Sequence, residues 1–501
     1  MEKYDVVVIG AGNGGLTSAA ILAQKGLGVL LLERHNIPGG CATSFCRGRF
    51  EFEVALHQLS GMGSPGRPGP LRGLLGDIGV LDDLEFVEMP DLYSVRMPDG
   101  FRITLQADRS MAVAQLQESF PGEAEAIERF FDLAYRYAQE MLAVFYFRDP
   151  SPSREKYPVL YSHAFRPAME VLDECFSDPL LKAVLSVYWS YVGLPPTRLS
   201  FAYLAILLFT YLEFKPFHIK GGSQALSNAI LNRFLASGGT ARFNCGAERI
   251  LVGDGAVKGV VTEHGDEISA RCVVSNVSQL TTYLQLMEPE EVPPQALQGI
   301  RGRSISPSAF SMFMGLDCEP GALGIESSTN FILAGTDLGD GIIEAMRRPD
   351  IAEEAMLLSC YDVSDPEFSP PGTCQANVVT LKYGEPWLRV PPSRYWQLKY
   401  RCAEAMLRRV EEVFPGVRGH IEELEVATPL TFMRYLGHPY GAIYGFEHYT
   451  KDAMFFQPSR ESPVRGLYFA SGWVGDMGFE PTLQAGRRAA TSVLKLLRGE
   501  A

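Results

Sequence analysis

Residues 4–15 read YDVVVIGAGNGG, a continuous apolar run that leads directly into a glycine-rich turn. An apolar run without alternation is typical of a parallel strand that is covered on both faces. The glycines at positions 10, 12 and 15 fit the pattern G-x-G-x-x-G, and residues 14–24 carry leucine and alanine at helical spacing. This order predicts a strand, a tight turn and a helix, which is the first unit of an α/β, Rossmann-type domain.

A second apolar run, Val29 to Leu32, ends at Glu33, a spacing at which a carboxylate accepts hydrogen bonds from ribose hydroxyls. Gly10 allows the tight turn, Gly12 lets the backbone approach a pyrophosphate, and Gly15 brings the helix against the strand. The N-terminus of the helix then offers unpaired N–H groups and a partial positive charge to phosphates. The first thirty-three residues therefore predict a bound dinucleotide.

Composition sets the limits of the interpretation. The chain has 501 residues, about three times the ~150 of one ordinary domain, and its 46% hydrophobic and 21% charged residues exclude disordered and fibrous classes. Its net charge of −14 argues against a nucleic-acid partner. The nine cysteines are thinly spread, which favours reduced thiols in a cytoplasmic protein. The longest apolar stretch, residues 199–212, is shorter than the ~18 residues that span a bilayer, so any membrane contact is expected to be peripheral.

Three blocks of sequence distinguish FAD from NAD. The first is the acid-x5-Gly-Gly segment at residues 33–40. The second, residues 221–276, combines a glycine pair, a helix, a hairpin and a strand, and the third, residues 466–497, reads as a strand, a loop and a helix. These blocks resemble two-domain flavoproteins of the glutathione-reductase structural class. Their order and spacing resemble the phytoene desaturase family of FAD-dependent oxidoreductases, which includes carotenoid desaturases, carotenoid cis–trans isomerases and retinol saturases.

The resemblance implies a Rossmann-type FAD-binding domain with a second, mixed α+β substrate domain built from two insertions. The expected FAD-binding parts are residues 1–75, 215–285 and 455–501. The expected substrate parts are residues 76–214, which look helical, and residues 286–454. FAD is expected to be bound non-covalently, because no histidine or cysteine stands in a flavinylation motif.

The motif and the resemblance together assign a set of residues to FAD. They are Gly10, Gly12, Asn13, Gly14, Gly15, Glu33, Arg34, Gly39, Gly40, Cys41, Ala42, Ile250, Gly472, Trp473, Asp476, Thr482 and Leu483. Two positions depart from the pattern of the family. Relatives usually carry a basic residue where Cys41 stands, and they often have Gly-Asp where Gly472 is followed by Trp473, so that Asp476 is the nearest acid.

The resemblance implies an enzyme that acts on carbon–carbon bonds of an apolar polyene, carotenoid, retinoid or isoprenoid-like lipid. Hydride transfer at flavin N5 would make it a desaturase, a saturase or an isomerase. Tyr444, Glu447 and His57 are the candidate catalytic residues that donate or accept a proton. The alternative interpretation is that each of them has only a structural role, in a packed loop or in the core. A histidine at the place of His57 resembles the saturase branch of the family more than the desaturase branch.

Other interpretations of the same residues remain open. Cys41 and Cys46 form C-x4-C near the position of a flavin disulfide reductase pair, although no mid-chain NAD-binding unit is found. An amine-oxidase-like flavoenzyme and a non-catalytic flavin-containing lipid-binding protein are the two alternative functions. No metal site is predicted, because the histidines are isolated along the chain. These histidines are His163, His218, His264 and His420.

The expected partner is a hydrophobic small-molecule substrate that must come from a membrane or a carrier. Residues 199–214 offer one apolar helical face that could lie on a membrane. The residues of this face are Phe201, Leu204, Leu208, Tyr211 and Leu212. The alternative interpretation places this helix wholly inside the substrate domain.

Overall fold

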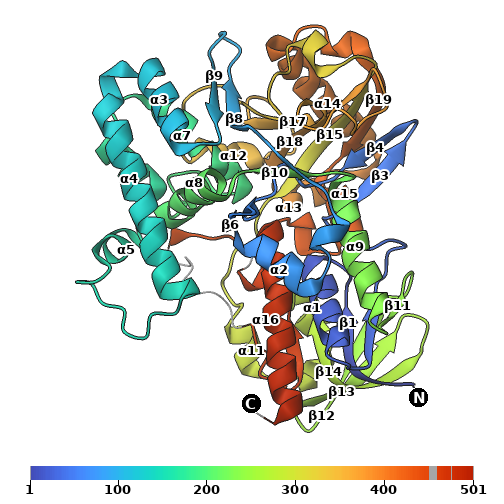
Figure 1. Cartoon of the computed structure of the whole chain (residues 1–501). Coiled ribbons are helices and arrows are strands. Elements are labelled where there is room, and N and C mark those ends of the chain that lie inside the picture. The colour runs from blue at the N-terminus through green and yellow to red at the C-terminus, as the bar shows by residue number, and fades with distance from the viewer. Residues whose placement is uncertain (1, 451–459, 476, 500–501) are drawn as a thin grey trace.

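The computed structural model describes residues 2–450, 460–475 and 477–499. Two seven-stranded sheets lie one above the other in Figure 1, and helices from the first insertion stand beside the upper sheet. Both ends of the chain lie at the foot of the lower sheet.

The lower sheet is the Rossmann-type sheet that the first motif predicts. Its strand order is β11 (Thr240–Arg242), β2 (Val29–Leu32), β1 (Glu2–Ile9), β14 (Glu267–Ser275), β13 (Ala256–Thr262) and β12 (Ala247–Gly253), and β20 (Leu467–Phe469) pairs with β14. β11, β2, β1, β14 and β20 pair in parallel, whereas β12 and β13 form the expected antiparallel hairpin.

Strand β1 is buried on both faces, as its continuous apolar run predicts. Val6 and Val8 pack into the core on one side of the sheet, and Val7 and Ile9 pack into the core on the other side. The first side is covered by α1 (Asn13–Gln24), α9 (Gly222–Ala236), α16 (Phe479–Arg498) and α2 (Pro70–Ile78). The second side is covered by α10 (Gln279–Gln285) and α11 (Pro294–Gln298).

Glycine allows α1 to approach the neighbouring elements closely. A Cβ at Gly15 would lie 1.9 Å from the carbonyl oxygen of Gly10, and a Cβ at Gly14 would lie 2.0 Å from that of Ala470. A Cβ at Gly486 of α16 would lie 2.4 Å from the carbonyl oxygen of Gly14. These contacts bring the start of α1, the end of β20 and the first half of α16 together.

The upper sheet combines strands from both insertions. Its strand order is β19 (Ile421–Ala427), β15 (Ser308–Leu316), β18 (Cys374–Lys382), β17 (Met356–Ser359), β16 (Thr329–Ile332), β8 (Asp91–Arg96) and β9 (Arg102–Gln106). The prediction that the first insertion is helical therefore fails for β8 and β9, because the parallel pairing of β8 with β16 completes the sheet across the two insertions. Helix α14 (Pro392–Val413) packs on this sheet, and α12 (Gly341–Met346) and α13 (Gly384–Leu388) lie beside it.

The rest of the first insertion is helical. It contains α3 (Arg109–Ser119), α4 (Ala124–Met141), a π-helical turn η3 (Leu142–Tyr146), α5 (Pro158–His163), α6 (Ala168–Cys175), α7 (Pro179–Ser186), the 3-10 turn η4 (Val187–Tyr191) and α8 (Phe201–Phe214). Shorter elements join the layers: β3 (Ser44–Arg47), β4 (Phe50–Glu53), β5 (Gly63–Ser64), β6 (Arg67–Pro68), β7 (Phe86–Glu88), β10 (Phe217–Ile219) and α15 (Pro429–Leu436).

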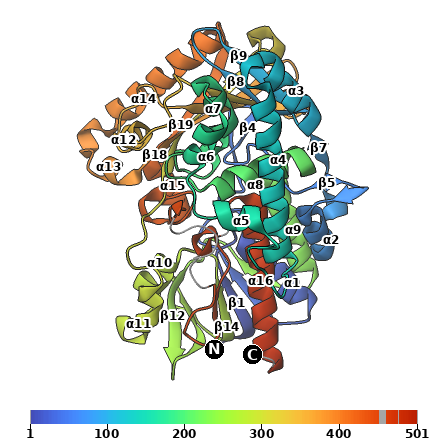
Figure 2. The ribbon, with the colours of Figure 1, turned by 90° about the vertical axis from the view of Figure 1, so that its left-hand side faces the viewer.

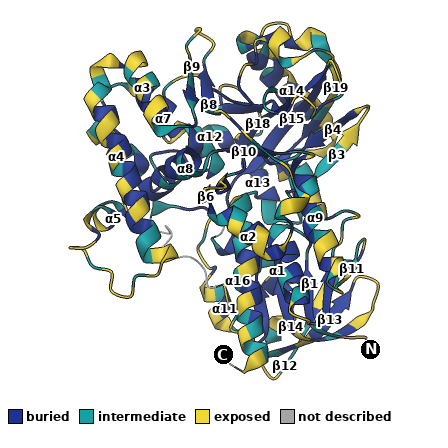
Figure 3. Ribbon diagram, viewed as in Figure 1, coloured by how far each residue is buried: buried dark blue, intermediate teal, exposed yellow. Residues whose placement is uncertain are grey.

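Helix α8 lies inside the molecule (Figure 3). Phe201 and Leu204 are completely buried, and Leu208, Tyr211 and Leu212 are at most 5% exposed. The face that could have lain on a membrane instead packs into the helical core around α4. The prediction of membrane contact through this helix is therefore wrong. Within the described residues, none of the helices combines the length and the apolar character that crossing a bilayer requires.

Candidate functional site

The G-x-G-x-x-G turn faces the end of β14. Gly10 has φ of +93°, which favours glycine, and the Gly12 N–H donates to Asn276 Oδ1 at 3.1 Å. The Nδ2 of Asn276 donates in turn to the carbonyl of Ala470. Asn276 thus ties the turn to β14 and β20. The sequence shows Asn276 at the end of a strand, but not this role, because its partners lie more than 190 residues away.

Glu33 lies at the carboxyl end of β2, as the motif predicts. Its Oε2 accepts from the Ala11 N–H at 2.7 Å and its Oε1 accepts from the His35 N–H at 2.8 Å. A carboxylate has about four acceptor positions, so lone pairs remain for ribose hydroxyls. The two backbone bonds hold the carboxylate beside the glycine turn.

The loop that contains Gly39 and Gly40 lies against the same turn. The Gly39 N–H donates to the Ala11 carbonyl at 2.8 Å, and a Cβ at Gly40 would lie 3.4 Å from Gly12 Cα. Helix α9 holds the other side of the loop through a bond of 2.7 Å from the Ser227 hydroxyl to the Ala42 carbonyl. Gly39, Gly40 and Ala42 are therefore brought to the turn, as expected.

Glu53 anchors α9, although it is not among the site residues predicted from the sequence. Its side chain is 2% exposed, and its Oε1 accepts from the N–H groups of Ala55 and Leu56 at 3.2 and 3.1 Å. The carboxylate also accepts from the N–H of Ser223 at 2.6 Å and from its hydroxyl at 2.7 Å, in the first turn of α9. A negative charge at a helix N-terminus is stabilised by the helix dipole. The available signal was the segment Phe50-Glu51-Phe52-Glu53, in which an acid follows two aromatic residues.

The chain's own atoms around the turn fit a dinucleotide. The N-caps of α1 and α16 are Gly12 and Gly478, and neither helix has a side-chain cap, so N–H groups of both first turns are available to a bound anion. Asn13 Oδ1 and Ser471 Oγ are buried atoms without a hydrogen-bond partner among the described residues. Thr482 and Leu483 are the fourth and fifth residues of α16, and Asn13 Nδ2 donates to Thr482 Oγ1 at 3.4 Å.

Some residues assigned to FAD have other partners. The Nη2 of Arg34 donates to the carbonyls of Arg434 and Tyr435 at 2.7 and 2.9 Å, so this side chain caps the C-terminus of α15 instead. The N–H of Ile250 donates to the Leu286 carbonyl at 2.6 Å, and its backbone amide is thus not left for an adenine.

The C-terminal positions of the motif were also assigned to FAD. Gly472 and Trp473 form a 3-10 turn after β20, where the buried indole packs edge-on against Phe446. Asp476 lies outside the described residues.

The structure argues against disulfide chemistry at Cys41 and Cys46. Both thiols are free, and Cys46 lies on the exposed hairpin strand β3. Burial raises the pKa of Cys41 to about 11, so that this group remains a thiol at neutral pH. Since thiolates carry out disulfide exchange, Cys41 is better interpreted as a packing residue.

A cavity of about 1310 Å³ connects the start of α16 with the helical part of the substrate domain. Its apolar end is lined by aromatic and aliphatic side chains of η3, η4 and α8. These include Phe145, Tyr146, Tyr191, Val192, Tyr203, Ile206, Leu207 and Tyr211. The other end is polar, and it is lined by the N-cap Gly478 and by side chains of α16 as far as Lys495. The volume exceeds the ~300–1,000 Å³ of ordinary small-molecule pockets.

His57 and Tyr444 both line this cavity. His57 Nδ1 lies 2.8 Å from the Ser359 hydroxyl, and its ring stacks on Tyr191. The Tyr444 hydroxyl donates to the Ser190 carbonyl at 2.7 Å, and burial raises the pKa of this tyrosine. The structure therefore brings together two of the three predicted catalytic residues, both in their neutral forms at pH 7.

Glu447 is placed differently. Its carboxylate is 3% exposed and accepts a hydrogen bond from the Tyr383 hydroxyl. It does not line the cavity among the described residues. Glu447 is therefore not placed beside His57 and Tyr444 in the cavity lining, and its role in proton transfer stays a prediction.

The pKa of His57 leads to a prediction on stability. Burial lowers this pKa to about 4, whereas an unfolded histidine titrates at about 6.5. The unfolded chain therefore binds an extra proton between these values, so stability is fully present above pH ~6.5 and is lost as the pH falls toward ~4. His57→Asn keeps a polar group near Ser359 but cannot titrate. The unfolding free energy of the wild type relative to this variant should fall by about 2 kcal/mol between pH ~7.5 and pH ~5.

Denaturant titrations of both proteins at the two pH values measure this difference. The contributions of all other titrating groups to the unfolding free energy cancel, because the two proteins differ only at residue 57. Equal pH dependence of the wild type and the variant would show that the imidazole is not desolvated.

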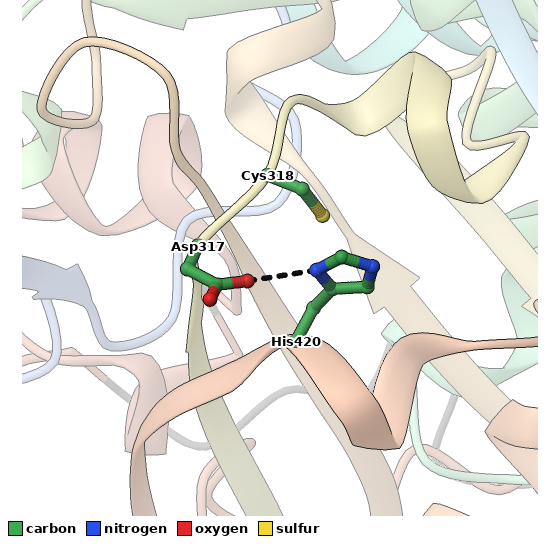
Figure 4. A group of neighbouring side chains, drawn as sticks. All are labelled: Asp317, Cys318 and His420. Atoms are coloured by element: carbon green, nitrogen blue, oxygen red, sulfur yellow. Dashed lines mark hydrogen bonds and ion pairs between the residues drawn. The ribbon is translucent and has the colours of Figure 1, made fainter.

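Asp317, Cys318 and His420 meet where β15 ends and β19 begins (Figure 4). Their ligand atoms lie within 4.8 Å of one another, and His420 Nδ1 lies 2.7 Å from Asp317 Oδ1. The pairing of β15 with β19 therefore brings His420, which is isolated along the chain, next to two other possible ligands. Structural zinc takes about four ligands and the described residues gather three here, so this cluster has no metal assigned to it.

Comparisons with known proteins agree with this geometry. The model of a family described as flavin containing amine oxidoreductase matches residues 14–494. The chain is 26% identical to prolycopene isomerase 2, chloroplastic, of an Oncidium hybrid cultivar, over 95% of this chain and 81% of that protein. It is also 26% identical to all-trans-retinol 13,14-reductase of Homo sapiens, over 99% and 86% of the two chains. An oxidoreductase from Methanosarcina mazei has the same fold, with a TM-score of 0.66 at 19% identity, over 98% of this chain and 100% of that chain.

The predicted resemblance is confirmed by these matches, which extend over nearly the whole chain. The glycine turn, Glu33 and the two uncapped helix N-termini are groups that could hold FAD. The chain belongs to the family of flavin-containing amine oxidoreductases and, within it, is an FAD-dependent oxidoreductase of the phytoene desaturase-like group.

Proposed function

We propose that this protein oxidises, reduces or isomerises carbon–carbon bonds of an apolar polyene, such as a carotenoid or a retinoid. The observation that carries the proposal is the cavity, whose apolar end is built from aromatic and aliphatic side chains. The relatives named prolycopene isomerase and all-trans-retinol 13,14-reductase support the same substrate class.

The charges of the cavity disfavour an amine substrate. Five basic side chains line it, and Glu461 is the single acidic one among the described residues. The basic residues are Arg148, Arg460, Arg487, Arg488 and Lys495. Among the described residues no carboxylate lines the apolar end, so an ammonium group bound there would lack a counter-charge. A neutral hydrocarbon chain avoids this cost.

Bound FAD supplies the hydride chemistry, and the protein supplies position and environment. The turn at Gly12 and the carboxylate of Glu33 hold the cofactor, and the aromatic walls exclude water from the substrate. The neutral imidazole of His57 can accept a proton, and the hydroxyl of Tyr444 can donate one if its bond to Ser190 is exchanged.

Anaerobic spectroscopy of the FAD-loaded protein tests the proposal. We expect a carotenoid or retinoid to change the oxidised or the reduced flavin spectrum, or to be isomerised by the reduced protein, whereas putrescine leaves the spectrum unchanged. A spectral change with the amine alone would instead establish an amine oxidase. Polyene binding without turnover in either redox state would indicate a lipid-binding protein.

We also infer that the cavity receives its substrate at a lipid surface through a patch formed by Tyr146, Phe147 and Tyr161. These side chains are 59%, 74% and 39% exposed, and Tyr146 also lines the cavity. The rings of Tyr146 and Phe147 contact each other edge-on, and α5, which carries Tyr161, packs against α4 (Figure 1). Aromatic rings next to a cavity entrance suit insertion into a membrane interface.

The double substitution Tyr146→Glu, Phe147→Glu should reduce co-sedimentation with phosphatidylcholine liposomes by about tenfold or more, since each buried aromatic ring is worth about 1.5–3 kcal/mol. Binding by the wild type should change little with salt, because it depends on apolar insertion. Leu235→Glu, Leu284→Glu adds the same charge at exposed positions of α9 and α10 and is the matched control. An equal loss in both double variants would rule out this patch.

A further inference from the structure

A second pocket lies on the substrate domain, away from the cavity. It has a volume of about 630 Å³ and is formed by the end of α12, the link between α13 and α14, and the first turns of α14. Four arginines line it: Arg347, Arg389, Arg394 and Arg401. None of the described residues lines both this pocket and the cavity. Figures 1 and 2 show α13 and α14 on a different side of the molecule from α5.

The pocket is strongly positive in a chain with a net charge of −14. Among the described residues, its lining includes no aspartate or glutamate, and none of its four arginines forms an ion pair. Elsewhere on the surface arginines do find carboxylates, as Arg198 does with Asp340 and Arg418 does with Glu404. The local absence of counter-charge is therefore a property of this pocket and not of the protein as a whole.

Three features place the four exposed arginines at the pocket. Arg347 lies over the ring of buried Tyr383, 4.5 Å from its centroid. Arg394 and Arg401 are two turns apart on α14 and therefore share one helix face. Arg389 lies two residues before Pro391 and Pro392, which restrict the backbone of the link to α14. The remaining walls are mostly apolar and are supplied by prolines, Val390 and Leu398.

We propose that this pocket binds a phosphate-bearing ligand with more than one negative charge. Arginine is suited to this ligand because its planar guanidinium donates two parallel hydrogen bonds to phosphate oxygens. The volume falls within the ~300–1,000 Å³ of small-molecule sites, so it admits a phosphate together with an apolar or planar body. The proposal does not depend on the polyene substrate.

Calorimetric titration of the FAD-loaded full chain with inorganic pyrophosphate tests the site, since bound FAD blocks the pyrophosphate position at Gly12. We expect saturable binding that weakens as salt is added. Arg389→Gln, Arg394→Gln should weaken it by about tenfold or more, because each charge-assisted hydrogen bond is worth about 1.5–3 kcal/mol. Flavin content and melting temperature check that the variant remains folded.

The control Arg102→Gln, Arg408→Gln removes two exposed arginines outside the pocket and should change affinity by less than about twofold. Absence of saturable binding, or an equal loss in both double variants, would overturn the proposal.

The phosphate can come from a soluble compound or from a lipid headgroup, and vesicles distinguish the two sources. An increase in recruitment when phosphatidic acid is added to phosphatidylcholine vesicles assigns the pocket to a headgroup, if the increase is lost in Arg389→Gln, Arg394→Gln and competed by pyrophosphate. Pyrophosphate binding without such an increase assigns it to a soluble ligand.

Discussion

Gly12→Val is expected to yield a protein without FAD. A Cβ at position 12 would stand at the N-terminus of α1, where the backbone must approach the pyrophosphate. Each charge-assisted hydrogen bond to a phosphate is worth about 1.5–3 kcal/mol, so loss of two or more weakens FAD binding by over about a hundredfold. The ratio of flavin absorbance to protein after purification measures the effect.

The structure requires a specific control for this substitution. The new Cβ would also lie 2.6 Å from Asn276 Oδ1, so a clash with this side chain is an alternative cause. Gly12→Val, Asn276→Ala removes the clash and should remain without flavin. Recovery of FAD in the double variant would show that Gly12 makes room for Asn276 and not for the cofactor. Gly73→Val, at an open and exposed position of α2, should keep its flavin.

Glu53→Ala should cause the largest loss of stability. The substitution removes an acceptor of four hydrogen bonds and leaves buried N–H groups of Leu56 and Ser223 without a partner. Since one unsatisfied buried group costs about 1–3 kcal/mol, we expect the free energy of unfolding to fall by about 3–5 kcal/mol. Chemical denaturation followed by circular dichroism provides the measurement.

The same substitution should weaken FAD retention, because α9 holds the loop that carries Gly39 and Gly40. Glu53→Gln retains an acceptor oxygen and should lose less stability than Glu53→Ala. Glu51→Ala removes an exposed carboxylate of the same strand and is the matched control. If Glu51→Ala and Glu53→Ala lose equal stability, the anchoring role of Glu53 is wrong.

Helix α8 shows that an apolar stretch can be buried inside the protein and need not contact a membrane. Residues 199–214 are the most apolar segment of the chain, yet α8 is surrounded by the helical core and by the cavity. The exposed rings of Tyr146, Phe147 and Tyr161 lie instead on or next to η3 and α5. Hydropathy reports which residues avoid water, but not whether protein or lipid covers them.

Local features of the sequence determined the first unit of the fold and its cofactor. The apolar run of residues 4–9, the glycines of the turn and Glu33 at the end of β2 act within about thirty residues, because backbone geometry and side-chain periodicity are local properties. For the same reason the bounds of β2 match the predicted strand.

Tertiary structure alone decided which distant residues complete the site. Asn276 reaches Gly12 across 264 residues, and Glu53 reaches Ser223 across 170 residues. It also decided that β8 joins the upper sheet, that Glu447 meets Tyr383, and that four arginines share one pocket. Such contacts depend on how whole elements pack, and a side chain has the same local sequence signal whether it meets a cofactor, a buried carboxylate or water.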